Sequence, residues 1–155
     1  MSPLVQDLLA GVWRRLPPRL RWWLLHRGHD RFLVGVLGIV HDDEGRVLLL
    51  EHRFRVPWPW GLPGGFVQHG EALEAALERE LREEMGLAVE LRPKPFDVEL
   101  SPHTQHLTVT FLARCATAPA DFAADGAEIV GSGLFGPEDL PARLSPRHAA
   151  LLRRF

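Results

Sequence analysis

Three glutamates on one predicted helix are the residues of this 155-residue chain best suited to chemistry. Glu80, Glu83 and Glu84 lie in a segment whose leucines recur at the spacing of one helix face. These leucines are Leu73, Leu77 and Leu81. At about 100° per residue, Glu80 and Glu84 point within roughly 20° of Leu73. The two carboxylates are therefore expected on the face that meets the core, with Glu83 beside them.

Carboxylates gathered on a partly buried face repel one another and raise one another's pKa unless a cation lies among them. Mg²⁺ or Mn²⁺ suits such a cluster, because these hard cations take oxygen ligands. A solvated acidic face is the alternative, but it would place its charges opposite the leucines. No second His or Cys stands at zinc-ligand spacing from His69. The pattern therefore predicts a Mg²⁺ or Mn²⁺ site.

A stiff, turn-rich loop leads directly into this helix. Residues 56–71 read VPWPWGLPGGFVQHGE, in which prolines and glycines oppose a continuous helix or central strand. Gly64 and Gly65 let bare backbone approach a metal or a phosphate, because no Cβ blocks the approach. Glu71 opens the helix, where the helix dipole favours a negative side chain. Carboxylates with a divalent cation and nearby backbone are typical of phosphoryl chemistry.

The loop and helix together resemble the Nudix box, G-x5-E-x7-R-E-U-x-E-E-x-G-U, where U is a bulky apolar residue. Every defined position is filled, by Gly65, Glu71, Arg79, Glu80, Leu81, Glu83, Glu84, Gly86 and Leu87. The likeness extends over roughly residues 32–141. It implies an α/β fold of the mixed α+β kind, with a mixed β-sheet sandwiched between helices.

The resemblance also implies a metal site and an activity, the Mg²⁺-dependent hydrolysis of a diphosphate bond in a nucleoside diphosphate linked to another group. The implied metal ligands are Glu80, Glu83 and Glu84, with the carbonyl of Gly64 or Gly65 as a further candidate. Arg79 would orient the carboxylates by charge-assisted hydrogen bonds. Glu71 would support the junction of loop and helix. Glu84 and Glu128 are the two candidates for the general base.

Substrate choice depends on residues outside the box. Trp58 could stack on a nucleobase, and His103 and His106 lie near the expected rim of the pocket. Gln68 stands where many members of the family carry Glu, which removes one candidate ligand. Pro102 stands fifteen residues after the box, a spacing that resembles the ADP-ribose-cleaving branch.

Three functions follow from these residues. The first is hydrolysis of ADP-ribose, a nucleotide sugar or a nucleoside triphosphate. The second is the same chemistry on an RNA 5′ end or a non-nucleotide. The third is a non-catalytic Nudix-fold nucleotide sensor, which would be expected to lose glutamates that this chain keeps.

The bulk composition, with 46% hydrophobic and 25% charged residues, is ordinary for a soluble globular protein. The formal net charge of −2 favours neither DNA nor an anionic membrane as a partner. A single cysteine, Cys115, excludes an intramolecular disulfide and fits a reducing cytoplasm. The longest apolar run, residues 32–40, is far below the roughly 18 residues of a transmembrane helix.

Residues 1–31 form a helical extension outside the Nudix resemblance. They contain six Arg, two Asp and three Trp, and an apolar helical repeat that ends at Pro17-Pro18. A cap on a sheet edge or a homodimer contact is the simplest interpretation, and a membrane-surface helix is the alternative.

The elements that must position the glutamates are expected in residues 32–155. Two apolar runs joined by the Asp/Gly turn at residues 42–45 predict a β-hairpin. Further strands are expected at residues 88–100, 105–116 and 128–135, with a looser segment before the last. The acidic helix is expected at about residues 71–85, ended by Gly86, and a second helix follows Ser145-Pro146.

Overall fold

The computed structural model describes residues 2–115 and 128–155, which divide into two compact units, residues 1–32 and 33–155. The looser segment predicted before the last strand lies outside the described residues. The first unit consists of the helices α1 (Pro3–Arg15) and α2 (Pro18–Gly28). Each begins at a proline, whose missing N–H costs nothing in the first turn of a helix. Their side chains include none that is buried.

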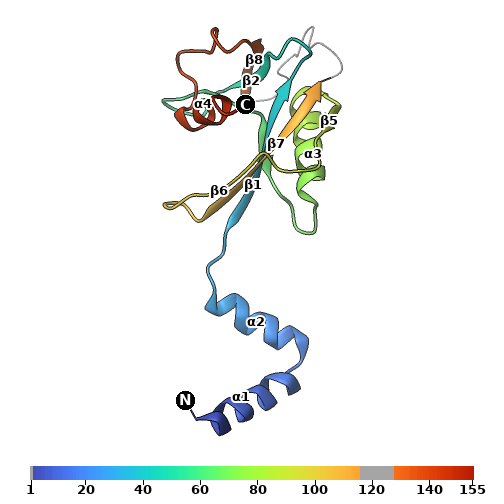
Figure 1. Ribbon diagram of the computed structural model, residues 1–155, viewed down its shortest axis with the longest axis vertical. Helices are drawn as coiled ribbons and strands as arrows, with labels where there is room; N and C mark the ends of the chain where they lie inside the picture. Colours follow the sequence, from blue (N-terminus) through green and yellow to red (C-terminus); the bar gives the residue numbers. More distant parts are fainter. Residues whose placement is uncertain (1, 116–127) are drawn as a thin grey trace. The chain divides into compact units, whose positions relative to one another are not determined.

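The second unit is built on a mixed sheet (Figure 1). Its strands are β1 (Leu33–His41), β2 (Val47–His52), β3 (Trp60–Gly61), β4 (Gly64–Phe66), β5 (Val89–Leu91), β6 (Asp97–Leu100), β7 (His106–Cys115) and β8 (Ile129–Phe135). The main path of the sheet is β3-β2-β1-β7-β5, with β4 beside β1, β6 beside β7 and β8 beside β2. Only β1 and β7 pair in parallel among the described strands, and they do so from Leu33↔His106 to His41↔Arg114.

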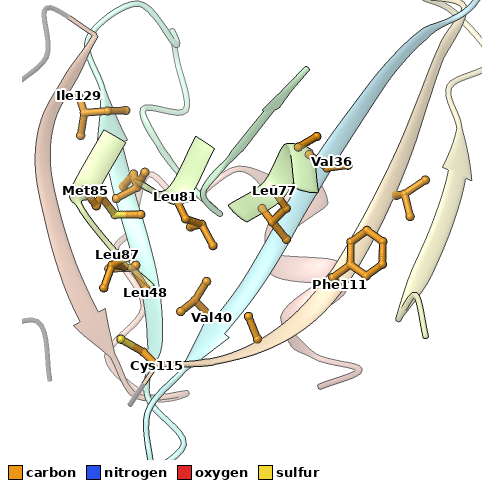
Figure 2. Packing of buried hydrophobic residues seen from close by; sticks show 14 residues of the cluster. Val36, Val40, Leu48, Leu77, Leu81, Met85, Leu87, Phe111, Cys115 and Ile129 are labelled. Carbon is orange, nitrogen blue, oxygen red and sulfur yellow. The ribbon is translucent and has the colours of Figure 1, made fainter. Parts of the chain in front are cut away.

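Two helices cover this sheet, α3 (Leu73–Met85) and α4 (Pro146–Leu152). Alternate residues of β1 and β2 face opposite sides, as the two-residue period of a strand requires. Val36, Val40, Leu48 and Leu50 pack with Leu77, Leu81 and Met85 of α3 (Figure 2). Leu37, Ile39, Val47 and Leu49 pack with Leu151 of α4. The predicted fold, a mixed sheet between helices, is thereby confirmed.

The ends of α3 follow from single residues. Gly86 adopts the left-handed conformation, with φ of 63°, and its N–H bonds to the Arg82 carbonyl at 2.9 Å. This is the C-terminal glycine that the sequence predicts. The helix begins at Leu73, two residues later than predicted, because Glu71 lies in the turn before it, where its N–H donates to the Gln68 carbonyl.

Two further boundaries differ from the sequence prediction. The turn-rich loop contains the short strands β3 and β4, because β4 pairs with the long strand β1 in spite of its glycines. The strand expected at residues 88–100 is split into β5 and β6. Pro93 and Pro95 fall in the break, and neither has an N–H to donate to a ladder.

Candidate functional site

A cavity of about 520 Å³ lies where the glycine loop, the acidic helix and the C-terminal helix meet. Strand β4 contributes Gly64 and Gly65, and α3 contributes Glu80 and Glu84. The other lining residues with polar side chains are Arg55, Gln68, His106, Thr108, Glu128, Arg147 and His148. Acidic and basic side chains from segments far apart in the sequence therefore face one cavity.

The two glycines let strand β4 lie close to both α3 and β1. A Cβ on Gly65 would overlap the carboxylate of Glu80, and a Cβ on Gly64 would overlap the Val36 carbonyl oxygen of β1. The backbone of β4 thus lies directly against the carboxylate of Glu80. The predicted approach of this backbone to a metal or a phosphate stays a prediction.

Arg79 is the centre of a hydrogen-bond network beside the cavity. Its Nε and Nη2 donate to the two carboxylate oxygens of Glu71 at 2.9 and 3.1 Å. Its Nη1 donates to Glu80 Oε1 at 2.9 Å and to Glu83 Oε2 at 3.2 Å, and Nη2 also donates to the Phe66 carbonyl at 3.0 Å. The hydrogen bond from Arg79 is the main cause of a lowered pKa of Glu71. Arg79 therefore bonds to three carboxylates of the box, and its role in orienting them for a metal stays a prediction.

Glu84 is the least satisfied carboxylate of the cavity. Its Oε2 is buried and has no hydrogen-bond partner. Burial, followed by repulsion from Glu80, raises the pKa of Glu84 to about 7. A buried carboxylate oxygen without a partner costs free energy that a hydrogen bond or a cation would recover. The donor set at this position, carboxylate oxygen beside glycine backbone, fits a hard divalent cation.

The carboxylates predicted as metal ligands do not converge on a common position. Among residues 2–115 and 128–155, no three carboxylate, imidazole or thiol side chains converge as metal ligands. Glu80 and Glu83 turn instead to the guanidinium of Arg79. Glu83 lies outside the cavity lining, and its side chain is 60% exposed. The metal-ligand set stays a prediction, with Glu80 and Glu84 the two members that face the cavity.

The other predicted site residues divide between the cavity and the surface. Glu128 lines the cavity, with a side chain that is 64% exposed, and Gln68 lines it as well. Trp58 is 44% exposed and His103 is exposed in a turn, and neither lines the cavity. His106 does line the cavity, where its Nε2 is buried without a hydrogen-bond partner.

The basic wall of the cavity is the part that sequence reasoning missed. Arg55 comes from the loop after β2, whereas Arg147 and His148 come from α4. His52, at the end of β2, lies behind this wall with its Nδ1 3.7 Å from Glu128 Oε1. No spacing in the sequence relates these residues, because their separation along the chain reaches 96 positions, from His52 to His148. The sequence signal for His52 is its place at the end of the apolar run of β2, which is buried on both faces.

The two buried histidines, His52 and His148, are expected to make the protein less stable in acid. His148 Nδ1 accepts the Leu62 N–H at 2.9 Å, so this nitrogen carries no proton. Burial is the main cause that lowers the pKa of His148 to about 3 and that of His52 to about 4, and the charge of Arg55 adds to it. An unfolded histidine has a pKa near 6.5. Below that pH the unfolded chain binds protons that the native state does not, so stability falls as the pH falls.

We expect each histidine to contribute at most about 2 kcal/mol to this loss at pH 5, from 1.4 kcal/mol per pKa unit. Urea unfolding between pH 7 and pH 5 measures it. His148→Gln keeps an acceptor for Leu62 and should show a shallower loss of stability than the wild type. His29→Gln, which changes an exposed histidine, is the control. Equal pH dependence in His148→Gln and the wild type would contradict the assignment.

Comparison with known proteins agrees with this architecture. The family model described as the NUDIX domain matches residues 31–155. The chain therefore belongs to the NUDIX family. Among solved structures, it is similar to a NUDIX hydrolase from Nitrosomonas europaea, with a TM-score of 0.69 and 29% identity over 81% of this chain and 71% of that one.

Two curated relatives match over shorter segments. "Nucleoside diphosphate-linked moiety X motif 6" of Xenopus laevis is 38% identical over 66 residues, 42% of this chain and 30% of the relative. "NAD-capped RNA hydrolase NudC" of Mycobacterium tuberculosis is 36% identical over 81 residues, 47% of this chain and 25% of the relative. The chain thus matches less than a third of the length of these relatives.

Proposed function

We propose that this protein is a Mg²⁺-dependent pyrophosphohydrolase that cleaves the diphosphate bond of a nucleoside diphosphate linked to another group. One observation carries the proposal: the unpartnered, buried Oε2 of Glu84 shares a cavity with the glycine backbone of β4 and with cationic side chains on the facing wall. Acidic residues hold the cation in such a site, and basic residues hold the phosphates. Mn²⁺ would serve the same ligands.

The residues of the chain have distinct tasks in this proposal. Glu80 and Glu84 bind the cation from α3, and a carbonyl of Gly64 or Gly65 adds an uncharged oxygen. When bound, the cation lowers the pKa of a coordinated water. Arg79 keeps Glu80 and Glu83 in place through the hydrogen bonds at 2.9 and 3.2 Å, and Glu71 keeps Arg79 in place.

Two carboxylates compete for the role of general base. Glu84 is half-buried beside Glu80, and burial raises its pKa to about 7 in the metal-free protein. A bound cation would favour its ionised form, which is the form that accepts a proton. Glu128 lies across the cavity, where its backbone carbonyl accepts the Arg53 N–H at 2.8 Å. Comparing the pH profile of kcat/KM for Glu128→Gln with that of the wild type distinguishes them. Loss of the acidic limb in Glu128→Gln would assign the base to Glu128.

A substrate panel tests the proposed function directly. We expect turnover of at least one of ADP-ribose, a UDP-sugar, NAD, a nucleoside triphosphate or an NAD-capped RNA in Mg²⁺, scored by the phosphate-containing products. EDTA should abolish that turnover. Tight binding of one nucleotide without turnover of any would replace the enzyme by a nucleotide sensor. The name of the NudC relative supports including capped RNA in the panel.

We propose further that residues 1–31 are a helical extension of a NUDIX domain at residues 32–155, and that they serve as a cap or as a homodimer contact in a cytoplasmic protein. The separation of unit 1–32 from unit 33–155 and the exposed leucines and tryptophans of α1 and α2 support this proposal. No helix of the described chain is long and apolar enough to cross a membrane. Removal of residues 2–31 should change the mass in solution if the extension forms a dimer. Lost binding to anionic liposomes would instead indicate a membrane-surface helix.

A further inference from the structure

We propose that Arg55 is a phosphate-binding residue whose guanidinium contacts non-bridging oxygens of the substrate diphosphate. The inference rests on the proposed function and adds a residue outside the Nudix box. Arg55 lies in the loop between β2 and β3 and lines the cavity that Glu80 and Glu84 enter from α3.

The loop that carries Arg55 is held at both ends. The Arg53 N–H donates to the Glu128 carbonyl at 2.8 Å, and the His52 N–H donates to the Pro59 carbonyl at 2.9 Å. Arg143 Nε donates to the Pro57 carbonyl at 3.3 Å. These hydrogen bonds involve residues before and after Arg55 in the chain, so they fix the backbone position of Arg55 without a bond from its side chain.

Gly61 makes room for the guanidinium. A Cβ on Gly61 would come within 3.1 Å of Arg55 Nη1 and within 2.7 Å of His148 Nδ1. The guanidinium therefore lies against the β3 backbone, next to the imidazole of His148. An alanine at position 61 would force the His148 imidazole to shift and would crowd the Arg55 guanidinium.

Arg55 is a half-buried cation without a direct counterion. Within the part of the chain that the structure describes, no hydrogen bond or ion pair involves its side chain. Glu84 and Glu128 bear on it electrostatically, yet neither comes within ion-pair distance. Burial is the main cause of a lowered pKa of Arg55. A guanidinium stays protonated at neutral pH even so, and its burial without a partner costs free energy that a bound anion would return.

The other basic side chains near the cavity are either uncharged at neutral pH or bonded to carboxylates. His52 and His148, with pKa values of about 4 and about 3, carry no charge at pH 7. Arg147 Nε donates to Glu99 Oε2 at 2.8 Å. Arg79 is occupied by three carboxylates. Arg147 also lines the cavity and keeps one buried nitrogen, Nη2, without a hydrogen-bond partner. Among the described residues of the lining, Arg55 is the cation whose side chain has neither a hydrogen bond nor an ion pair, so it is the first candidate to meet a phosphate.

The chemistry of a guanidinium suits this task. Its planar fork of donors binds two phosphate oxygens in a fixed bidentate geometry, whereas a lysine ammonium acts as a point charge. With carboxylates on α3 and a guanidinium opposite, a diphosphate would be held between a cation and Arg55. Charge that develops on the phosphoryl oxygens would then be stabilised by a donor already in place.

Binding of α,β-methylene-ADP in Ca²⁺, measured by calorimetry, tests the proposal without turnover. We expect Arg55→Met to weaken binding at least tenfold, and Arg55→Lys to recover part of it. Arg53→Met is the matched control, because Arg53 is exposed two residues away and does not line the cavity. It should bind within twofold of the wild type. Thermal unfolding of each variant verifies that the fold is kept.

Turnover separates this proposal from the proposed function. On the best substrate of the panel, we expect kcat/KM of Arg55→Met to fall about 10²-fold, the typical effect of removing one transition-state donor. If the wild type binds the analogue through Arg55 but hydrolyses nothing, the hydrolase proposal fails and the phosphate site stands. If Arg55→Met binds the analogue as tightly as Arg53→Met does, or if the wild type does not bind it at all, the phosphate site is overturned.

Discussion

Replacing Glu84 with glutamine is expected to lower kcat at least 10²-fold and, at the same time, to stabilise the metal-free protein at alkaline pH. The loss of activity follows from removing a charged oxygen ligand from the cavity. The gain in stability follows from the pKa of about 7, raised above the usual 4.5 by burial and by Glu80. Catalysis and folding thus place opposite demands on one side chain.

The raised pKa of Glu84 makes the stability of the wild type depend on pH. Between pH 4.5 and pH 7 the native state keeps a proton on Glu84 that the unfolded chain has lost, so wild-type stability falls as the pH rises through that window. The full effect is about 3 kcal/mol at 1.4 kcal/mol per pKa unit. Glutamine carries no charge at either pH. The stability difference between Glu84→Gln and the wild type should therefore grow from pH 5 to pH 8.

Urea unfolding in EDTA at pH 5, 6.5 and 8 provides the measurement. Glu78→Gln, on the exposed face of the same helix, is the matched control and should follow the wild type at every pH. Added Mg²⁺ should stabilise the wild type more than Glu84→Gln. Wild-type turnover by Glu84→Gln would show that the metal and catalytic assignments are wrong.

The neighbouring variants Gly64→Ala and Gly65→Ala are expected to fail in different ways. A Cβ at Gly64 would meet backbone, the Val36 carbonyl oxygen and, at 2.9 Å, the Leu37 Cα. Backbone in a central strand cannot move aside, and the φ of 150° is one that alanine rarely adopts. We expect the free energy of unfolding to fall by roughly 2–4 kcal/mol.

Gly65→Ala should instead keep its fold and lose its function. Its Cβ would meet the end of a flexible side chain, the carboxylate of Glu80, which can rotate away. Rotation would break the bond from Arg79 Nη1 to Glu80 and withdraw a proposed metal ligand. We expect the urea midpoint to stay near that of the wild type, with kcat/KM reduced at least tenfold. A larger loss of stability in Gly65→Ala than in Gly64→Ala would contradict this order.

The sequence by itself determined the elements whose signals are local. The leucine repeat and Gly86 predicted α3 and its end, because a helix is specified by contacts three and four residues apart. The antiparallel pair of β1 and β2 could likewise be expected from two apolar runs joined by an Asp/Gly turn. The Gly64-Gly65 pair indicated that the backbone at these positions lies close to another group. All three features depend on residues near one another in the chain.

The tertiary structure alone decided which distant side chains share the cavity. Arg55 from the loop after β2, and Arg147 and His148 from α4, line the same cavity as Glu84, and no spacing in the sequence records that arrangement. Trp58 and His103 show the converse, since residue type suggested binding whereas the paths of their loops leave them outside the lining. The strands β3 and β4 formed against expectation because their partners, β2 and β1, supply the hydrogen bonds. Burial, strand pairing and the charges around a side chain depend on residues that are neighbours in space, so only the tertiary structure determines them.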